Sequence, residues 1–84
     1  MDVIWTPKAL KQLTKLKDRQ ARERIAQATR VLSRFPEVSG VKALKNHQYG
    51  YRLRVGDYRV LFDVFDHARI VSIEEVKKRD ERTY

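Results

Sequence analysis

Two alternating runs joined by a two-residue turn dominate the C-terminal half of the chain. Residues 51–55 and 58–65 both alternate between apolar and mainly polar positions, a period of two that is typical of strands with one buried face. Gly56-Asp57 between the runs predicts a β-hairpin. The hairpin brings Arg52, Arg54 and Arg59 into one neighbourhood. Three guanidinium groups fixed on a sheet indicate an anionic ligand.

The N-terminal half has the pattern of a short strand followed by two helices. Residues 2–5 are too few for a helix and favour a first strand. Thr6 and Pro7 then suit the N-cap and first position of a helix, and Asp18 can cap a second helix. Pro36 ends the helical hairpin, which we expect over residues 7–35. The first helix has an apolar stripe at Leu10, Leu13 and Leu16, and the second has a buried face at Ala21, Ile25, Ala28, Leu32 and Phe35.

The order of these elements predicts the fold class. Residues 37–48 form a connecting loop, residues 66–68 a turn and residues 69–76 a last strand. We expect a single domain over residues 1–84: a strand at 2–5, the helical hairpin at 7–35, a three-stranded meander at 49–76 and a basic tail at 77–84. This is a βααβββ order of the α+β class, with two helices on one face of a small twisted antiparallel sheet. The first strand is expected to pair with the last or the middle strand, which makes four strands.

Composition and charge narrow the cellular context and the partner. The 84 residues include no cysteine, no signal peptide pattern and no apolar run of membrane-spanning length, which favours a soluble cytoplasmic protein. Nineteen Lys and Arg against 11 Asp and Glu give a net charge of +8. A polyanion or an acidic protein is therefore the expected partner, although a charge that serves solubility alone would look the same. Basicity alone does not separate DNA, RNA, a ribosome and an acidic protein.

Most catalytic chemistries lack their residues in this sequence. His47 and His67 have no ligand-type spacing, so no metal site is expected. The three glycines are isolated, and the serines have no histidine at a recognisable spacing. Glu74 and Glu75 would point to opposite faces of a strand and would not form a carboxylate pair. Arginine, lysine and tyrosine remain, and they suit cleavage of RNA by its own 2′-hydroxyl, a reaction that needs alignment, charge stabilisation and proton transfer.

The hairpin sequence carries a family resemblance. The run Tyr51-x-Leu-x-Val-Gly-Asp-Tyr-Arg-Val-Leu-Phe62, preceded by Lys42-Ala-Leu-Lys45 and two amphipathic helices, resembles the RelE/ParE toxin superfamily. It is most similar to the RelE-like mRNA interferases of type II toxin–antitoxin systems. The resemblance covers essentially the whole chain and implies the βααβββ fold. It also implies metal-independent mRNA cleavage on the ribosome, no cofactor, a cognate antitoxin, contact with operator DNA only through that antitoxin, and no membrane.

The resemblance also implies roles for individual residues. Arg59 is expected to hold the scissile phosphate, and Arg52 and Arg54 take the positions of the family's first basic pair. Tyr84 would stack on the substrate base or assist proton transfer. The expected catalytic residues are Arg59, Arg79 and Tyr84, and the expected substrate-binding residues are Arg52, Arg54, Lys78 and Arg82.

The chain departs from the family pattern at its proton-transfer positions. Some members carry lysines where this chain has Arg52 and Arg54, and arginine is a poorer proton donor and acceptor. Another branch uses a glutamate before the hairpin and a histidine beside the terminal tyrosine, where this chain has Lys42 and Thr83. The sequence therefore identifies no general base. Two alternatives stay open: a ParE-like inhibitor of DNA gyrase, and a non-catalytic basic module that binds ribosomes or RNA.

Overall fold

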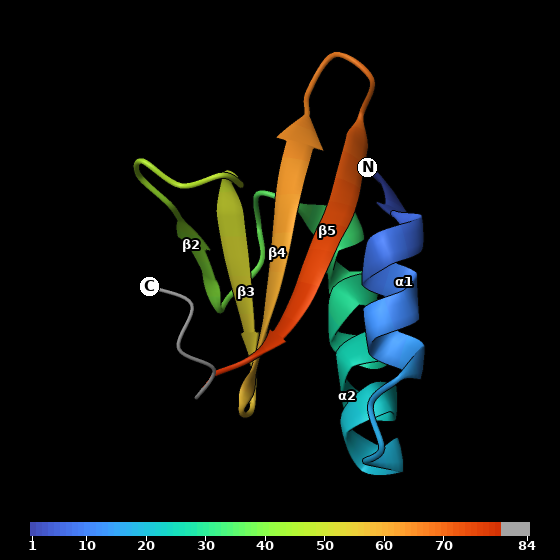
Figure 1. The fold of residues 1–84 in the computed structure, drawn as a ribbon. Coiled ribbons are helices and arrows are strands. Elements are labelled where there is room, and N and C mark those ends of the chain that lie inside the picture. Colours follow the sequence, from blue (N-terminus) through green and yellow to red (C-terminus); the bar gives the residue numbers. More distant parts are fainter. Residues whose placement is uncertain (80–84) are drawn as a thin grey trace.

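The computed structural model describes residues 1–79 of the chain. Figure 1 shows two helices on one side of a twisted sheet, with α1 beside β5; no helix of residues 1–79 lies on the opposite face, which we call the open face. This arrangement confirms the predicted α+β class. The elements are β1 (Asp2–Trp5), α1 (Pro7–Thr14), α2 (Arg19–Arg30), the 3₁₀ helix η1 (Val31–Arg34), β2 (Val41–Ala43), β3 (Tyr51–Val55), β4 (Tyr58–Phe65) and β5 (Ile70–Lys78).

The sheet differs from the expected one in two respects. Its order is β1-β5-β4-β3-β2, so five strands pair where four were predicted. The added strand, β2, has three residues, too few to produce a periodic signal within the expected loop. The sheet is also mixed rather than wholly antiparallel, because β1 runs parallel to β5. Most of the chain separates these two strands, which gives the length of connection that a parallel pair requires.

Both predicted helix starts are confirmed by their capping hydrogen bonds. Thr6 Oγ1 accepts from the backbone N–H of Ala9 at 3.1 Å, and Pro7 occupies the first turn. Asp18 Oδ1 accepts from the N–H groups of Gln20 and Ala21 at 2.9 and 3.3 Å. These bonds satisfy donors that have no partner within the helix itself. They fix where α1 and α2 begin.

The core lies between the helices and the inner face of the sheet. Its largest fully buried side chains are Phe62, Ile25, Leu32, Ile73, Val60 and Val71. The predicted apolar stripe of the first helix is wrong at Leu10, which is 49% exposed, whereas Ala9 is fully buried. The reason is the docking of α1 on the edge of β5. On that edge, Gln12 Oε1 accepts a hydrogen bond from the N–H of Val76 at 2.7 Å. α1 therefore covers the part of the β5 edge that lies beyond the pairing with β1.

The hairpin that positions the basic residues forms as the sequence predicts. Val55 pairs with Tyr58, which leaves Gly56 and Asp57 as a two-residue turn. Gly56 has φ +56°, and Asp57 has no positive φ, as in a type II′ turn. Such a turn follows the right-handed twist of the strands and holds their register. The register in turn decides which side chains meet on the open face.

Candidate nucleic-acid interface

Cross-strand pairing gathers basic side chains on the open face of the sheet. Arg54 pairs with Arg59, and Arg59 pairs with Lys77, so three cations form one row across β3, β4 and β5. Lys42 pairs with Arg52 in the neighbouring row. Residues that pair directly point to the same side of a sheet. Arg52, Arg54 and Arg59 therefore share one face, as the alternation in the sequence predicts. We call Arg52, Arg54, Arg59 and Lys77 the basic face.

This row of like charges is unfavourable unless an anion compensates it. Like charges directly opposite one another destabilise a sheet, by a few tenths to about 1 kcal/mol per pair. The Nε atom of Arg52 is in addition buried and has no hydrogen-bond partner within residues 1–79. A buried donor without a partner costs about 1–3 kcal/mol. Both features are typical of a site whose ligand supplies the missing acceptor atoms.

A β-bulge corrects the prediction for the two adjacent glutamates. Leu61 pairs with Glu75, but Phe62 pairs with Ile73, so Glu74 is the extra residue. Ser72 lies on the open face and donates from Oγ to Glu74 Oε2 at 2.7 Å. Because the extra residue interrupts the alternation, Glu74 and Glu75 lie on the same face, and the expectation of opposite faces is wrong. Acidic as well as basic side chains therefore line the open face.

Glu75 ties two lysines to the edge of the basic face. Its Oε1 atom lies 3.6 Å from Lys77 Nζ and 3.5 Å from Lys8 Nζ on α1. The side chains of Glu75 and Lys77 are only 12% and 28% exposed, so this pair is screened less than a surface pair. Lys77 is absent from the predicted site residues because the site residues of the expected tail were taken from the family resemblance, which did not include it. Its polar side chain directly after the apolar Val76 was the available signal.

Of the remaining predicted site residues, two lie at the end of β5 and two lie beyond residue 79, where the described part of the chain ends. Lys78 pairs with Tyr58 at the hairpin turn. Arg79 is exposed, and its backbone N–H donates to the carbonyl of Asp57 at 2.5 Å, which fixes it beside the same turn. Arg82 and Tyr84 lie outside the described residues. The structure thus brings Arg52, Arg54 and Arg59 to one face, with Arg79 beside the turn at the same end of the sheet, whereas Lys78 is in the row of Val55 and Tyr58 on the opposite face.

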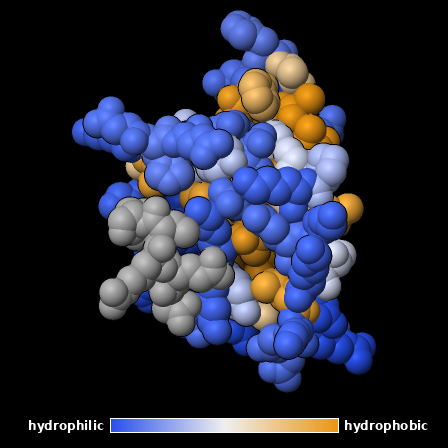
Figure 2. Space-filling view, in the orientation of Figure 1, coloured by the Kyte–Doolittle hydropathy of each residue, from blue (hydrophilic) through white to orange (hydrophobic). Residues whose placement is uncertain are grey.

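The chemistry available on this face is that of fixed cations. Figure 2 shows hydrophilic residues over most of the surface in view, with apolar residues reaching it in smaller patches. Among residues 1–79 no three histidine, aspartate or glutamate side chains are grouped so that they could hold a metal ion. The helices of this part of the chain are all too short or too polar to span a membrane. Planar guanidinium groups bind phosphate oxygens bidentately, and the face suits a polyanion backbone.

The comparisons with known proteins agree with this fold. Strong structural matches to RelE toxins show that the chain has a RelE-like fold. Residues 3–83 match the family model described as ParE toxin of type II toxin–antitoxin system, parDE, so the chain belongs to that family, within the RelE/ParE superfamily. No curated protein matches the chain.

Three solved structures illustrate the likeness. The toxin–antitoxin complex RelBE2 of Mycobacterium tuberculosis matches with a TM-score of 0.78 at 27% identity, over 93% of this chain and 96% of that one. The archaeal RelE–RelB complex of Pyrococcus horikoshii matches with 0.75 at 24% identity, over 95% and 96%. The isolated RelE toxin of E. coli matches with 0.78 at 20% identity, over 98% and 87%. At 24% and 20% identity, the latter two comparisons show that those proteins and this chain have the same fold.

Proposed function

We propose that this toxin is a ribosome-dependent endonuclease that cleaves mRNA without a metal ion and so inhibits translation in the cytoplasm. The observation that carries the proposal is the Arg54–Arg59–Lys77 row, with the buried Nε atom of Arg52 beside it. An RNA backbone offers one phosphate per nucleotide, which supplies negative charge to the row and an acceptor atom to the Nε atom of Arg52. Family membership supports a toxin, and the basic face supports an RNA target.

The proposed reaction uses the RNA's own nucleophile. The 2′-hydroxyl of one nucleotide loses its proton and attacks the adjacent phosphorus, the bond from phosphorus to the 5′-oxygen breaks, and that oxygen takes up a proton. The products carry a 2′,3′-cyclic phosphate and a 5′-hydroxyl. Arg59, at the centre of the row, binds the non-bridging oxygens and stabilises the negative charge that develops on them. Arg79, fixed beside the hairpin turn, adds a second cation.

The other proposed roles rest on the family resemblance. Tyr84 stacks on the substrate base or assists proton transfer, and Lys78 and Arg82 bind the RNA. The RelE relatives of M. tuberculosis and P. horikoshii were solved as complexes with an antitoxin. We extend that partner to this chain: a cognate antitoxin binds and neutralises it, and operator DNA is contacted only through the antitoxin.

The test is the substitution Arg59→Ala in cells that express the toxin alone. Growth inhibition should disappear, and primer extension should show mRNA cleavage reduced by about 10²–10³, the usual effect of removing one charge-stabilising donor. The fold should remain, because Arg59 lies on the open face, and circular dichroism checks this. Arg34→Ala on η1, an exposed arginine on the helical side, is the control and should stay toxic. Equal toxicity of Arg59→Ala and the wild type would refute the site.

A gyrase inhibitor is the second candidate, and the ParE description of the matching family model favours it. The two functions separate in two assays. Cuts within codons of translated mRNA, with normal supercoiling activity of gyrase, support the endonuclease. Blocked supercoiling with intact mRNA supports the gyrase inhibitor. Ribosome binding without any cut would identify a non-catalytic binding module instead.

A further inference from the structure

The half of the open face that lies away from the basic face carries exposed apolar side chains. Ile4 on β1 and Phe65 on β4 are 47% and 52% exposed, two of the four large apolar side chains of residues 1–79 that are exposed. Phe65 pairs directly with Ile70 on β5, and Ile4 pairs with Ser72, two residues further along β5. Paired and diagonal side chains on one face lie within about 8 Å of each other. Ile4, Ile70 and Phe65 therefore form one surface, which we call the apolar patch.

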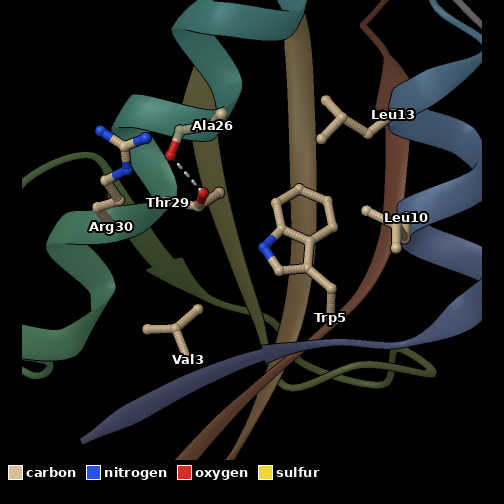
Figure 3. Close-up of a pocket in the computed structure, with 7 residues that line it drawn as sticks. All are labelled: Val3, Trp5, Leu10, Leu13, Ala26, Thr29 and Arg30. Atoms are coloured by element: carbon tan, nitrogen blue, oxygen red, sulfur yellow. Dashed lines mark hydrogen bonds between the residues drawn. The ribbon is translucent and has the colours of Figure 1, made fainter.

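The direction of β1 determines the side on which Ile4 lies. Figure 3 shows its neighbours Val3 and Trp5 pointing from β1 into the space between the two helices. Since successive side chains of a strand point to opposite faces, Ile4 points to the open face. Figure 2 shows apolar residues at the surface of this end of the molecule, near the join between β4 and β5. Exposed apolar side chains that gather in one place, rather than occurring singly, mark an interaction surface.

The charge around the apolar patch is opposite to that of the chain as a whole. Residues 1–7 and 60–76 cover β1 and the greater part of β4 and β5, and they contain five of the 11 acidic residues but one of the 19 Lys and Arg. The acids are Asp2, Asp63, Asp66, Glu74 and Glu75, and the cation is Arg69 in the turn before β5. Asp2 pairs with Ile70, so its carboxylate lies directly beside the patch. A partner at the patch must therefore be cationic as well as apolar.

The apolar patch and the basic face act as separate electrostatic surfaces. Phe65 follows Arg59 by six positions on β4, which is about 20 Å along a strand. Charges at the surface are screened over about 8 Å at physiological ionic strength. The basic face therefore does not attract an anion to the patch, and the carboxylates beside the patch repel phosphate. RNA fits the first surface only, whereas a protein segment with apolar side chains and cationic flanks fits the second.

We propose that the apolar patch docks on a basic protein of the ribosome while the basic face holds the mRNA. The inference rests on the ribosome-dependent function proposed above, and it names the partner for the other half of the same face. Proteins that bind ribosomal RNA carry clustered Lys and Arg, so they offer a cationic protein surface next to RNA. The two halves of the open face together match such a ribonucleoprotein, and free RNA engages only one of them. This gives a physical reason for dependence on the ribosome.

The first test compares binding of the purified toxin to programmed ribosomes and to single-stranded RNA. The mRNA carries a 2′-deoxynucleotide at the cleaved position, so that neither measurement depends on cleavage. Phe65→Ser should weaken ribosome binding at least about fivefold, the usual threshold for a residue that anchors an interface, and leave RNA affinity unchanged. Leu10→Ser is the matched control, because Leu10 is 49% exposed on the helical side (Figure 3). It should bind both targets as the wild type does, and thermal denaturation checks that both variants are folded.

Charge reversal gives a second measurement that does not disturb packing. Asp2→Lys raises the net charge by two but should weaken ribosome binding about two- to fivefold, because an ion pair with a cationic partner is lost. Glu37→Lys makes the same change of charge at an exposed loop position. It should leave binding equal or strengthen it, because the ribosome as a whole is a polyanion. The loss at Asp2 should shrink at high salt, since screening reduces the repulsion.

Cross-linking on purified ribosomes identifies the partner. A photoreactive p-benzoylphenylalanine in place of Phe65 should link the toxin to a basic ribosomal protein, which mass spectrometry identifies. Cross-links confined to ribosomal RNA, or wild-type ribosome affinity in both Phe65→Ser and Asp2→Lys, would overturn the proposal. So would self-association of the toxin that Phe65→Ser abolishes, or a loss of affinity for the antitoxin alone. Ribosome binding that needs the patch but is followed by no mRNA cleavage would refute the nuclease function and support this inference.

Discussion

Glu75 shows how one side chain can order a face of opposite charge. Its carboxylate contacts Lys77, which is paired with Arg59, and Lys8, which reaches it from α1. A single negative charge at the end of a row of cations reduces their mutual repulsion. It also fixes the ammonium group of Lys77, whose flexible side chain would otherwise sample many rotamers. We infer that Glu75 positions Lys77 for the substrate.

This inference predicts a separation of binding from catalysis. Glu75→Gln removes one negative charge from the open face, so RNA affinity should stay equal or rise slightly. The cleavage rate at saturating RNA should fall roughly tenfold, because a small displacement of a group that contacts the substrate costs this much or more. Steady-state kinetics on ribosomes programmed with a defined mRNA separates the two parameters.

Glu74→Gln is the control for this prediction, since Glu74 accepts a hydrogen bond from Ser72 and an amide oxygen can replace that acceptor. Its kinetics should match the wild type. A Glu75→Gln protein with an unchanged rate at saturation would show that the ion pair has no role in positioning. An equal loss in both variants would point to the bulge itself.

At the scale of the elements, locally encoded features were predictable and long-range ones were not. The caps at Thr6 and Asp18 and the turn at Gly56-Asp57 were predicted because neighbouring residues determine them. The pairing of β1 with the last strand was one of the two expected arrangements, but its parallel direction and the bulge at Glu74 were missed, since both depend on contacts between strands. The exposure of Leu10 also depends on docking, and no pattern within α1 reveals it.

The residues of the candidate site also divide into those that the local sequence pattern predicts and those that depend on pairing between strands. Alternation along the sequence predicts that Arg52, Arg54 and Arg59 share one face, and the strand register confirms it. Lys77 was missed because the last strand was expected to end at Val76, and whether it continues to residue 78 depends on pairing with β4. The ion pair between Lys77 and Glu75 was not predicted for the same reason. The catalytic roles of these residues remain predictions.

The hairpin turn gives a prediction about stability. Gly56 has φ +56°, and a Cβ atom there would lie 3.2 Å from Arg24 Nη1, the mobile end of a long side chain. The strain of the backbone is therefore the larger effect, and Gly56→Ala should lower the free energy of unfolding by about 1 kcal/mol. For a domain of this size that corresponds to a fall in Tm of about 4–8 °C, measured by thermal denaturation.

Gly56→Asn is the matched comparison, because asparagine adopts positive φ more readily than alanine and also adds a side chain. It should recover most of the lost stability. Equal destabilisation by alanine and asparagine would mean that the contact with Arg24, and not the backbone, sets the cost.

At the scale of the whole molecule, the charge of +8 is distributed over both sides of the sheet. The basic face offers a row of cations at fixed spacing, which a polyanion backbone fits. The helical side carries exposed cations such as Arg30 and Arg34 outside this row. Salt should weaken RNA binding to either set, and the number of ions displaced distinguishes them.

Salt titration of RNA binding makes this distinction quantitative. If Arg52, Arg54, Arg59 and Lys77 each neutralise one phosphate, the logarithm of the binding constant should fall with the logarithm of salt concentration with a slope of about −3. The probe is a single-stranded RNA with a 2′-deoxynucleotide at the cleaved position, which binds without reacting. Arg59→Ala should reduce the magnitude of the slope by about 0.7, and Arg34→Ala, remote from the basic face, should leave it unchanged. A slope that both substitutions reduce equally would mean that RNA follows the general field of the protein rather than the row on the sheet.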